Sequence, residues 1–192
     1  MSAVKEKEQE PEHIWLICGY AGSGKDTAAG ILAKNLSRAN ISSFASAVKD
    51  FVAKAHNLDR QLFDTQEGKR QRVDSMRTIR DLLIEYAESE KLNYGDLAIW
   101  ARRLNPPANT AHWILSDWRF KAELDCLRER FPNARIHTIR VVRREVVPLE
   151  TETEHELDGL HCDVILDNSS SRISLGNLIE RKIHAEIERS VI

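Results

Sequence analysis

The chain has 192 residues, with 28 Lys and Arg against 30 Asp and Glu, for a formal net charge of −2. This length suits one domain with a sizeable core, and the balanced charge gives no basic excess for non-specific nucleic-acid binding. No run is apolar enough to cross a membrane, and the charged stretch before Pro11 is no signal peptide. We therefore expect a cytoplasmic domain at 13–192 behind a disordered tail at 1–12, as a monomer or homodimer with no nucleic-acid or membrane partner.

The cysteines and histidines show no metal-binding pattern. Cys18, Cys126 and Cys162 have neither paired nor metal-ligand spacing, and the seven histidines are scattered. Cys18 and Cys162 lie in apolar segments, where free cysteine is commonly a core residue. These features favour a reducing compartment and assign no catalytic histidine.

Short apolar runs alternate with segments of helical period along the chain. The strands are predicted at 14–18, 41–46, 112–116, 135–142 and 162–166. The clearest helices are predicted after residue 27 and at 48–56, 97–104, 120–131 and 175–187, with a further helical face from Ile79 to Tyr86. The segment 57–74 is predicted as loop or short helix. This alternation predicts an α/β three-layer sandwich, with a five-stranded parallel sheet covered on both faces.

A glycine-rich segment directly follows the first strand. It reads Gly19, Tyr20, Ala21, Gly22, Ser23, Gly24, Lys25, Asp26 and Thr27. A strand followed by a glycine-rich turn and then a helix is the setting that a phosphate-binding loop requires. The backbone N–H groups and the positive helix end would face a phosphate, and Lys25 would add a mobile cation. This pattern predicts that the nine residues bind the phosphates of a nucleotide.

The residue after the lysine departs from the common pattern. Ser or Thr usually stands there and its hydroxyl binds magnesium, whereas this chain has Asp26 followed by Thr27. Asp26 either holds a magnesium-bound water or acts as a carboxylate stabilised by the helix dipole. Both interpretations stay open.

The segment after the third predicted strand carries charged residues. In parallel sheets ligands bind beyond the carboxyl ends of the strands, so Asp117 is predicted to approach magnesium and Arg119 to neutralise phosphoryl charge. The alternatives are a helix N-cap for Asp117 and an ion pair with Glu123 for Arg119. We predict Lys25, Asp117 and Arg119 as the catalytic group.

A second group is predicted to hold an acceptor molecule. It consists of Ser46, Lys49, Arg80, Trp100 and Arg119. Lys49 follows the second predicted strand, Arg80 opens a helix, and Trp100 would line a base pocket. Ordinary exposed Lys49 and Arg80 side chains and a core role for Trp100 are the alternatives.

The segment at 143–160 has no core face and is predicted as a lid or a plain solvated loop. Arg143 and Arg144 at its entry suit contacts with the nucleotide phosphates. The rest is more acidic than a segment that clamps phosphate should be, with Glu145, Glu150, Glu152, Glu154 and Glu156.

Five motifs together resemble the phage-type deoxynucleoside monophosphate kinases. They are Gly22–Thr27, Ala45–Asp50, Ser116–Phe120 with Glu123, Thr153–Glu154 with Leu157–Asp158, and Asp163–Ile165 with Asn168. The animal-type phosphomevalonate kinases share almost the same motifs. Thr27 and the Asp117-x-Arg119-Phe120 pattern resemble the nucleotide enzymes more closely, whereas Thr151 replaces a histidine common among them and His155 is out of register.

The resemblance implies a P-loop kinase fold of the nucleoside monophosphate kinase type, with ATP as phosphoryl donor and Mg²⁺ as cofactor. It implies transfer of the γ-phosphate to a deoxynucleoside monophosphate, or to phosphomevalonate in the second family. In this picture Asp26 and Asp117 approach the metal. A nucleotide-binding protein without catalysis is the contrasting class, and the chain has no guanine-reading Asn-Lys-x-Asp motif to favour it.

Overall fold

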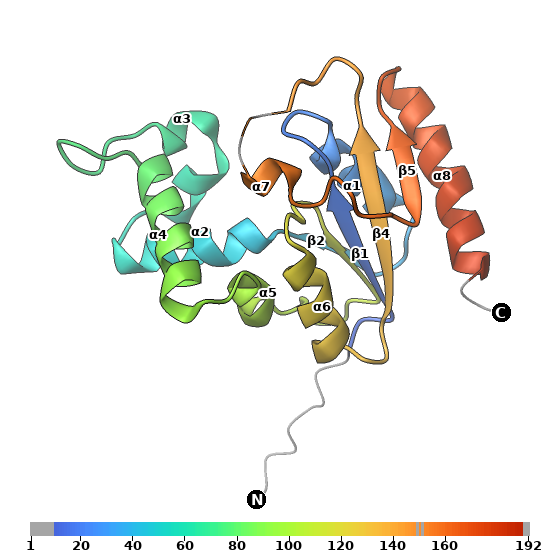
Figure 1. The fold of residues 1–192 in the computed structure, drawn as a ribbon, viewed down its shortest axis with the longest axis horizontal. Helices are drawn as coiled ribbons and strands as arrows, with labels where there is room; N and C mark the ends of the chain where they lie inside the picture. The colour runs from blue at the N-terminus through green and yellow to red at the C-terminus, as the bar shows by residue number, and fades with distance from the viewer. Residues whose placement is uncertain (1–9, 149, 151, 190–192) are drawn as a thin grey trace, which may run out of the picture. The chain divides into compact units, whose positions relative to one another are not determined.

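The computed structural model describes residues 10–148, 150 and 152–189 (Figure 1). The chain forms two compact units, of which one contains residues up to 42 and from 105 onward, and the other is Ser43–Leu104. The single domain predicted at 13–192 stays a prediction, and most of the predicted tail lies outside the described residues. In the described part of the chain no helix is both long and apolar enough to cross a bilayer.

The first unit is built on a parallel sheet of five strands in the order β2-β3-β1-β4-β5. The strands are β1 His13–Cys18, β2 Ala39–Ser42, β3 His112–Leu115, β4 Arg135–Val142 and β5 Val164–Asp167. All four neighbouring pairs run parallel. This topology confirms the predicted α/β fold with a parallel sheet of five strands.

The end of the second strand was predicted wrongly. The segment 41–46 was expected to be extended, but β2 ends at Ser42 and helix α2 (Phe44–Ala55) begins two residues later. The Ser43 side chain accepts the backbone N–H of Ser46 at 3.1 Å, which caps the helix. Capping therefore outweighs the strand propensity of Phe44, and the helix predicted at 48–56 begins four residues earlier, at Phe44.

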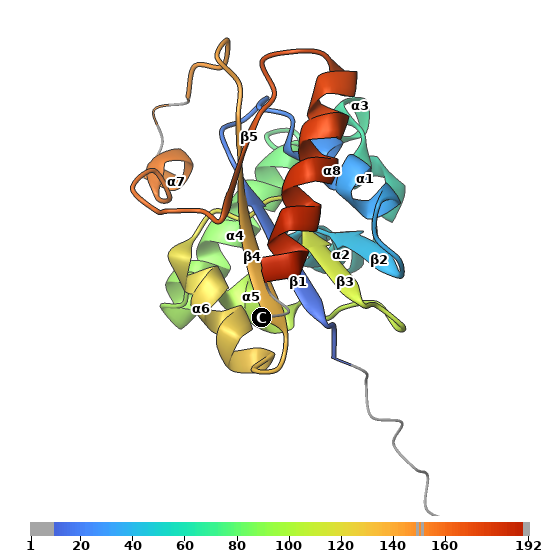
Figure 2. The same ribbon diagram turned by 90° about the vertical axis from the view of Figure 1, so that its right-hand side faces the viewer.

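Helices cover both faces of the sheet in the first unit. Helices α1 (Lys25–Lys34) and α8 (Arg172–Arg189) lie on one face, and α6 (Lys121–Arg130) lies on the other (Figures 1 and 2). The short helix α7 (Glu152–His155) lies in the predicted lid segment. The three layers of the predicted sandwich are thus present.

The central strand explains why the sheet is covered on both faces. Ile14, Trp15, Leu16 and Ile17 in β1 are all 0% exposed, so the strand has no polar face. A continuous apolar run of this kind is typical of a parallel strand between helices. On the face covered by α1 and α8, Trp15 and Ile17 pack with Leu32 and Ile179.

The second unit is helical. It contains α2, the 3₁₀ helix η1 (Arg60–Asp64), α3 (Gln66–Lys69), α4 (Ile79–Tyr94) and α5 (Ile99–Arg103). At the start of α4, Asp81 accepts the backbone N–H of Thr78 at 2.8 Å, and Thr78 accepts that of Asp81 at 3.3 Å. This capping box fixes the first turn, in which Arg80 stands.

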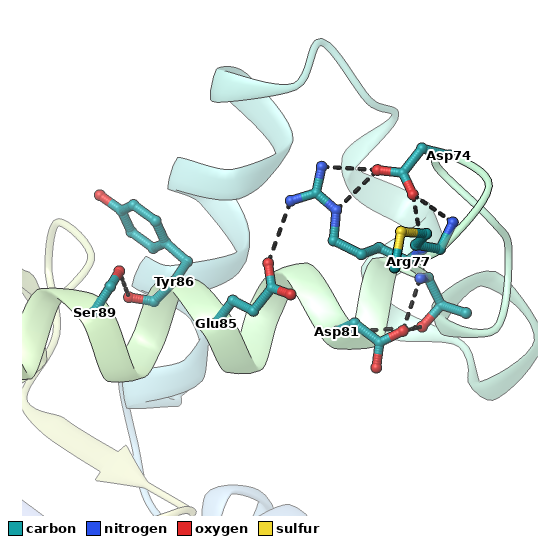
Figure 3. Close-up of polar contacts among 8 residues, drawn as sticks. Asp74, Arg77, Asp81, Glu85, Tyr86 and Ser89 are labelled. Carbon is teal, nitrogen blue, oxygen red and sulfur yellow. Dashed lines mark hydrogen bonds and ion pairs between the residues drawn. The ribbon is translucent and has the colours of Figure 1, made fainter.

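Charged contacts also fix the loop before α4 (Figure 3). Arg77 contacts Asp74 at 2.7 Å and Glu85 at 3.3 Å. The backbone N–H of Met76, followed by the guanidinium of Arg77, lowers the pKa of Asp74 to about 2. The loop is therefore held by its own turn and by α4, all within the second unit.

Candidate phosphate-binding site

The loop after β1 has the backbone conformation that its glycines permit. Gly24, the residue before α1, has φ +97°, in the left-handed region that only glycine enters without strain. The Asn168 side chain, which follows β5, donates to the carbonyl of Ser23 at 2.8 Å. The loop therefore passes into the helix in a defined shape, as predicted for a segment that presents N–H groups to a phosphate.

Lys25 folds back over this loop. Its Nζ donates to the carbonyl of Gly19 at 2.7 Å and to that of Tyr20 at 2.9 Å. Burial, followed by the nearby charge of Arg119, lowers the pKa of Lys25, whereas Glu154 and Asp26 act in the opposite direction. Lys25 is thus a half-buried cation whose charge an anionic ligand would stabilise.

Asp26 and Ser116 form a contact between α1 and the end of β3. The Ser116 hydroxyl donates to Oδ1 of Asp26 at 3.1 Å. The hydroxyl of Ser116 thus follows β3. The carboxylate of Asp26 stands in α1 at the position where a phosphate-binding loop usually carries a hydroxyl. Asp26 is exposed and Asp117, next to Ser116, is half-buried. Carboxylate and hydroxyl oxygens of this kind are the ligands that Mg²⁺ prefers in proteins.

Asp117 and Arg119 lie in the turn between β3 and α6. Helix α6 begins at Lys121, and Phe120 stands at its N-cap, so Asp117 does not cap this helix. Arg119 precedes the helix, in agreement with the predicted bounds 120–131. Glu123 accepts the backbone N–H groups of Arg119 and Phe120, both at 3.0 Å, and so shapes the turn that carries Arg119.

A pocket lies beside the loop. Its lining residues, all in the first unit, are Cys18, Gly19, Tyr20, Lys25, Trp118, Arg119, Arg140, Thr153, Glu154 and Leu157. The structure therefore brings Lys25 and Arg119 together with part of the predicted loop. Within the described residues no group of three or more His, Cys, Asp or Glu is arranged to hold a metal ion.

Arg140 is a pocket residue that the sequence prediction missed. It stands opposite Cys18 in the register of β1 and β4. One guanidinium nitrogen, Nη2, donates to the carbonyls of Leu157 and Leu160, the latter at 3.2 Å. Arg140 lies near the carboxyl end of β4, the edge at which ligands bind in parallel sheets, and the sequence alone assigned it no role.

The thiols of Cys18 and Cys162 lie 3.9 Å apart beside Arg140. The hydrogen bond between the two thiols lowers the pKa of Cys162 to about 7 and raises that of Cys18. Both residues are buried, as predicted, and both are free. Their proximity has no signal in the sequence, because they are 144 residues apart.

The segment around α7 contacts the loop. Glu154 accepts the backbone N–H of Ala21, and Asp158 accepts the Tyr20 hydroxyl at 2.8 Å. His155 Nδ1 lies 2.7 Å from the other carboxylate oxygen of Asp158. The acidity of this segment is evident from the sequence, but these contacts are not. Thr151 lies outside the described residues.

The two entry arginines are exposed. Arg143 lies 3.3 Å from Glu145, and Arg144 lies 3.9 Å from Asp167. They are absent from the residues that line the described pocket. Their predicted contacts with nucleotide phosphates stay a prediction.

The remaining predicted acceptor residues lie in the second unit. The hydroxyls of Ser43 and Ser46 are 2.8 Å apart, Lys49 binds Asp64 at 2.9 Å, and Arg80 is exposed. Trp100 is 3% exposed, which agrees with its alternative core role, and its indole nitrogen has no hydrogen-bond partner in the described part of the chain. Arg103 stacks on its ring at 5.2 Å.

No family model and no curated protein matches the sequence. Among solved structures, the chain is similar to a gluconokinase from Sinorhizobium meliloti at 11% sequence identity and a TM-score of 0.49. The match covers 95% of this chain and 98% of the gluconokinase chain. An APS kinase mutant from Mycobacterium tuberculosis has 12% identity, 92% and 99% coverage, and a TM-score of 0.42. A sugar kinase from Janibacter sp. has 15% identity, 91% and 94% coverage, and a TM-score of 0.39. Scores and identities this low support no argument about activity.

Proposed function

We propose that the chain is an ATP-dependent phosphotransferase whose acceptor is a small phosphate monoester, with a deoxynucleoside monophosphate as the first candidate. The observation that carries the proposal is the pocket that joins the glycine loop and Lys25 to Arg119. Phosphoryl transfer depends chiefly on positioning and on neutralising charge, which a loop of N–H groups and two cations supply.

The chain's own residues have distinct parts in this proposal. The loop amides and Lys25 would hold the outer phosphates of ATP, and Arg119 would neutralise charge on the transferring group. The oxygen atoms of Asp26 and Asp117 suit Mg²⁺, which would supply charge neutralisation when bound. Lys49 and Arg80 are the cations proposed to bind the acceptor phosphate, and Arg80 is exposed at a defined helix start.

An acceptor panel tests the proposal. Purified protein is mixed with ATP and Mg²⁺, and ADP release is followed with dGMP, dTMP, dCMP or phosphomevalonate as acceptor. Turnover with a deoxynucleotide is the expected result. Turnover with phosphomevalonate alone would move the assignment to that acceptor, and nucleotide binding without any transfer would identify a non-catalytic protein.

The Lys25→Ala variant is the matched control for this assay. Because Lys25 is half-buried beside Arg119, we expect its removal to lower the rate by about 100-fold or more. The loss of two hydrogen bonds to the loop should change the melting temperature by only a few degrees. Activity that survives this substitution would exclude the loop from catalysis.

A further inference from the structure

A carboxylate is bound at the loop that the proposed function assigns to phosphate. The backbone N–H of Ala21, in the glycine loop, donates to Oε1 of Glu154. Backbone N–H groups of such loops bind anionic oxygens, and a carboxylate oxygen is an acceptor of the same kind as a phosphate oxygen. The contact therefore uses a donor that the proposed function assigns to nucleotide.

The surrounding charges explain why an anion is stable there. Among the residues that line the pocket, Lys25, Arg119 and Arg140 are cationic, and Glu154 alone carries a carboxylate. The nearby charge of Arg119 lowers the pKa of Lys25, and Glu154 opposes this effect. Glu154 thus offsets part of the repulsion between Lys25 and Arg119.

Other contacts hold Glu154 against the loop. The Tyr20 hydroxyl donates to Asp158 at 2.8 Å, and Asp158 also contacts His155 at 2.7 Å. Arg140 donates to the carbonyls of Leu157 and Leu160, which follow Glu154 in the chain. The segment 153–160 is therefore attached to the glycine loop and to β4 by several bonds. Figure 1 shows α7 beside the loop that follows β1.

We propose that Glu154 is an internal competitor of the nucleotide, with its carboxylate on the Ala21 N–H that a phosphate oxygen must take. Nucleotide binding then requires the segment 153–160 to release the loop, so the observed affinity is reduced by the cost of this release. This role accounts for one carboxylate of the acidic segment, that of Glu154. The inference rests on the proposed function.

The test compares Glu154→Gln with Glu156→Gln. Both remove one negative charge from the same segment, but Glu156 is exposed and two residues from the contact. Calorimetric titration with ADP, and with inorganic tripolyphosphate as a probe without a base, gives the dissociation constants. We expect Glu154→Gln to bind both about 3- to 10-fold more tightly, where tenfold corresponds to about 1.4 kcal/mol, and Glu156→Gln to change affinity by less than about twofold.

A second variant tests the attachment of the segment. Asp158→Asn keeps Glu154 but weakens the contacts with Tyr20 and His155, so it should also tighten binding, by a smaller factor than Glu154→Gln. Equal or weaker binding by Glu154→Gln would overturn the inference. If wild type, Glu154→Gln and Lys25→Ala all fail to bind either probe, the proposed function itself fails, which is a distinct outcome.

Discussion

At the scale of single residues, Gly19 is a point at which the glycine loop comes close to the main chain of β4. It has φ +141°, and a Cβ placed there would lie 2.3 Å from the carbonyl oxygen of Val141 in β4. That oxygen belongs to the sheet and cannot move aside as a flexible side chain would. The carbonyl of Gly19 also accepts a hydrogen bond from Lys25. Gly19 therefore fixes both the close approach of the loop to β4 and the position of Lys25.

We expect Gly19→Ala to destabilise the protein by roughly 1–3 kcal/mol and to weaken nucleotide binding at least about tenfold, because the loop must shift. The control is Gly30→Ala in α1, where nothing lies within 4 Å of the added Cβ. An alanine in a helix interior should instead stabilise by about 0.5–1 kcal/mol. Urea unfolding measures both; similar effects from the two substitutions would contradict the steric argument.

At the scale of elements, the start of α6 determines where Arg119 stands. Glu123 is 3% exposed, and its carboxylate accepts two backbone N–H groups in the turn between β3 and α6. The sequence suggests an ion pair of Glu123 with Arg119, and the structure shows Glu123 bound to the backbone of Arg119 and Phe120. The strength of a charge-assisted bond to backbone N–H groups explains why this glutamate is buried.

Glu123→Ala should lower the free energy of unfolding by roughly 1–3 kcal/mol, because it leaves two N–H groups without their acceptor. Glu123→Gln keeps an oxygen acceptor of the same shape and should cost less than half as much. Chemical denaturation of the two variants tests this prediction. An equal loss in both would mean that the negative charge, rather than the acceptor, is what matters.

At the scale of the whole molecule, three histidines lie together on the sheet of the first unit, with His137 buried and His13 and His112 half-buried. His13 stacks on His112 at 4.7 Å, and its Nδ1 lies 2.9 Å from Nε2 of His137. Burial, then repulsion by His13, lowers the pKa values of His112 and His137 to about 4. Burial also lowers the pKa of His13. Glu12, Asp163 and Glu186 face the cluster and only partly oppose these shifts.

These shifts predict loss of stability in mild acid. The unfolded chain takes up protons as the pH falls through about 6.5, whereas the folded cluster resists them until about 4, so stability falls between these values. For His137, 3% exposed, the loss is on the order of 3 kcal/mol. Urea unfolding between pH 7.5 and about 4.5 measures it.

His137→Gln should flatten this pH dependence, because it removes one of the shifted groups. His184→Gln, at an exposed position of α8, is the control and should leave the dependence unchanged. A wild-type stability that is constant between pH 7 and about 5 would contradict the predicted role of the cluster.

Local features of the sequence were enough to predict the parallel sheet, its five strands and the loop at 19–27, because each depends on a pattern of neighbouring residues. Local capping by Ser43 shortened the second strand, and this weaker signal was missed. The contacts of Glu154 with Ala21, of Cys18 with Cys162, and of His13 with His137 join residues more than 120 positions apart. Only the tertiary structure decides such pairs, because strand order and register determine which distant side chains meet.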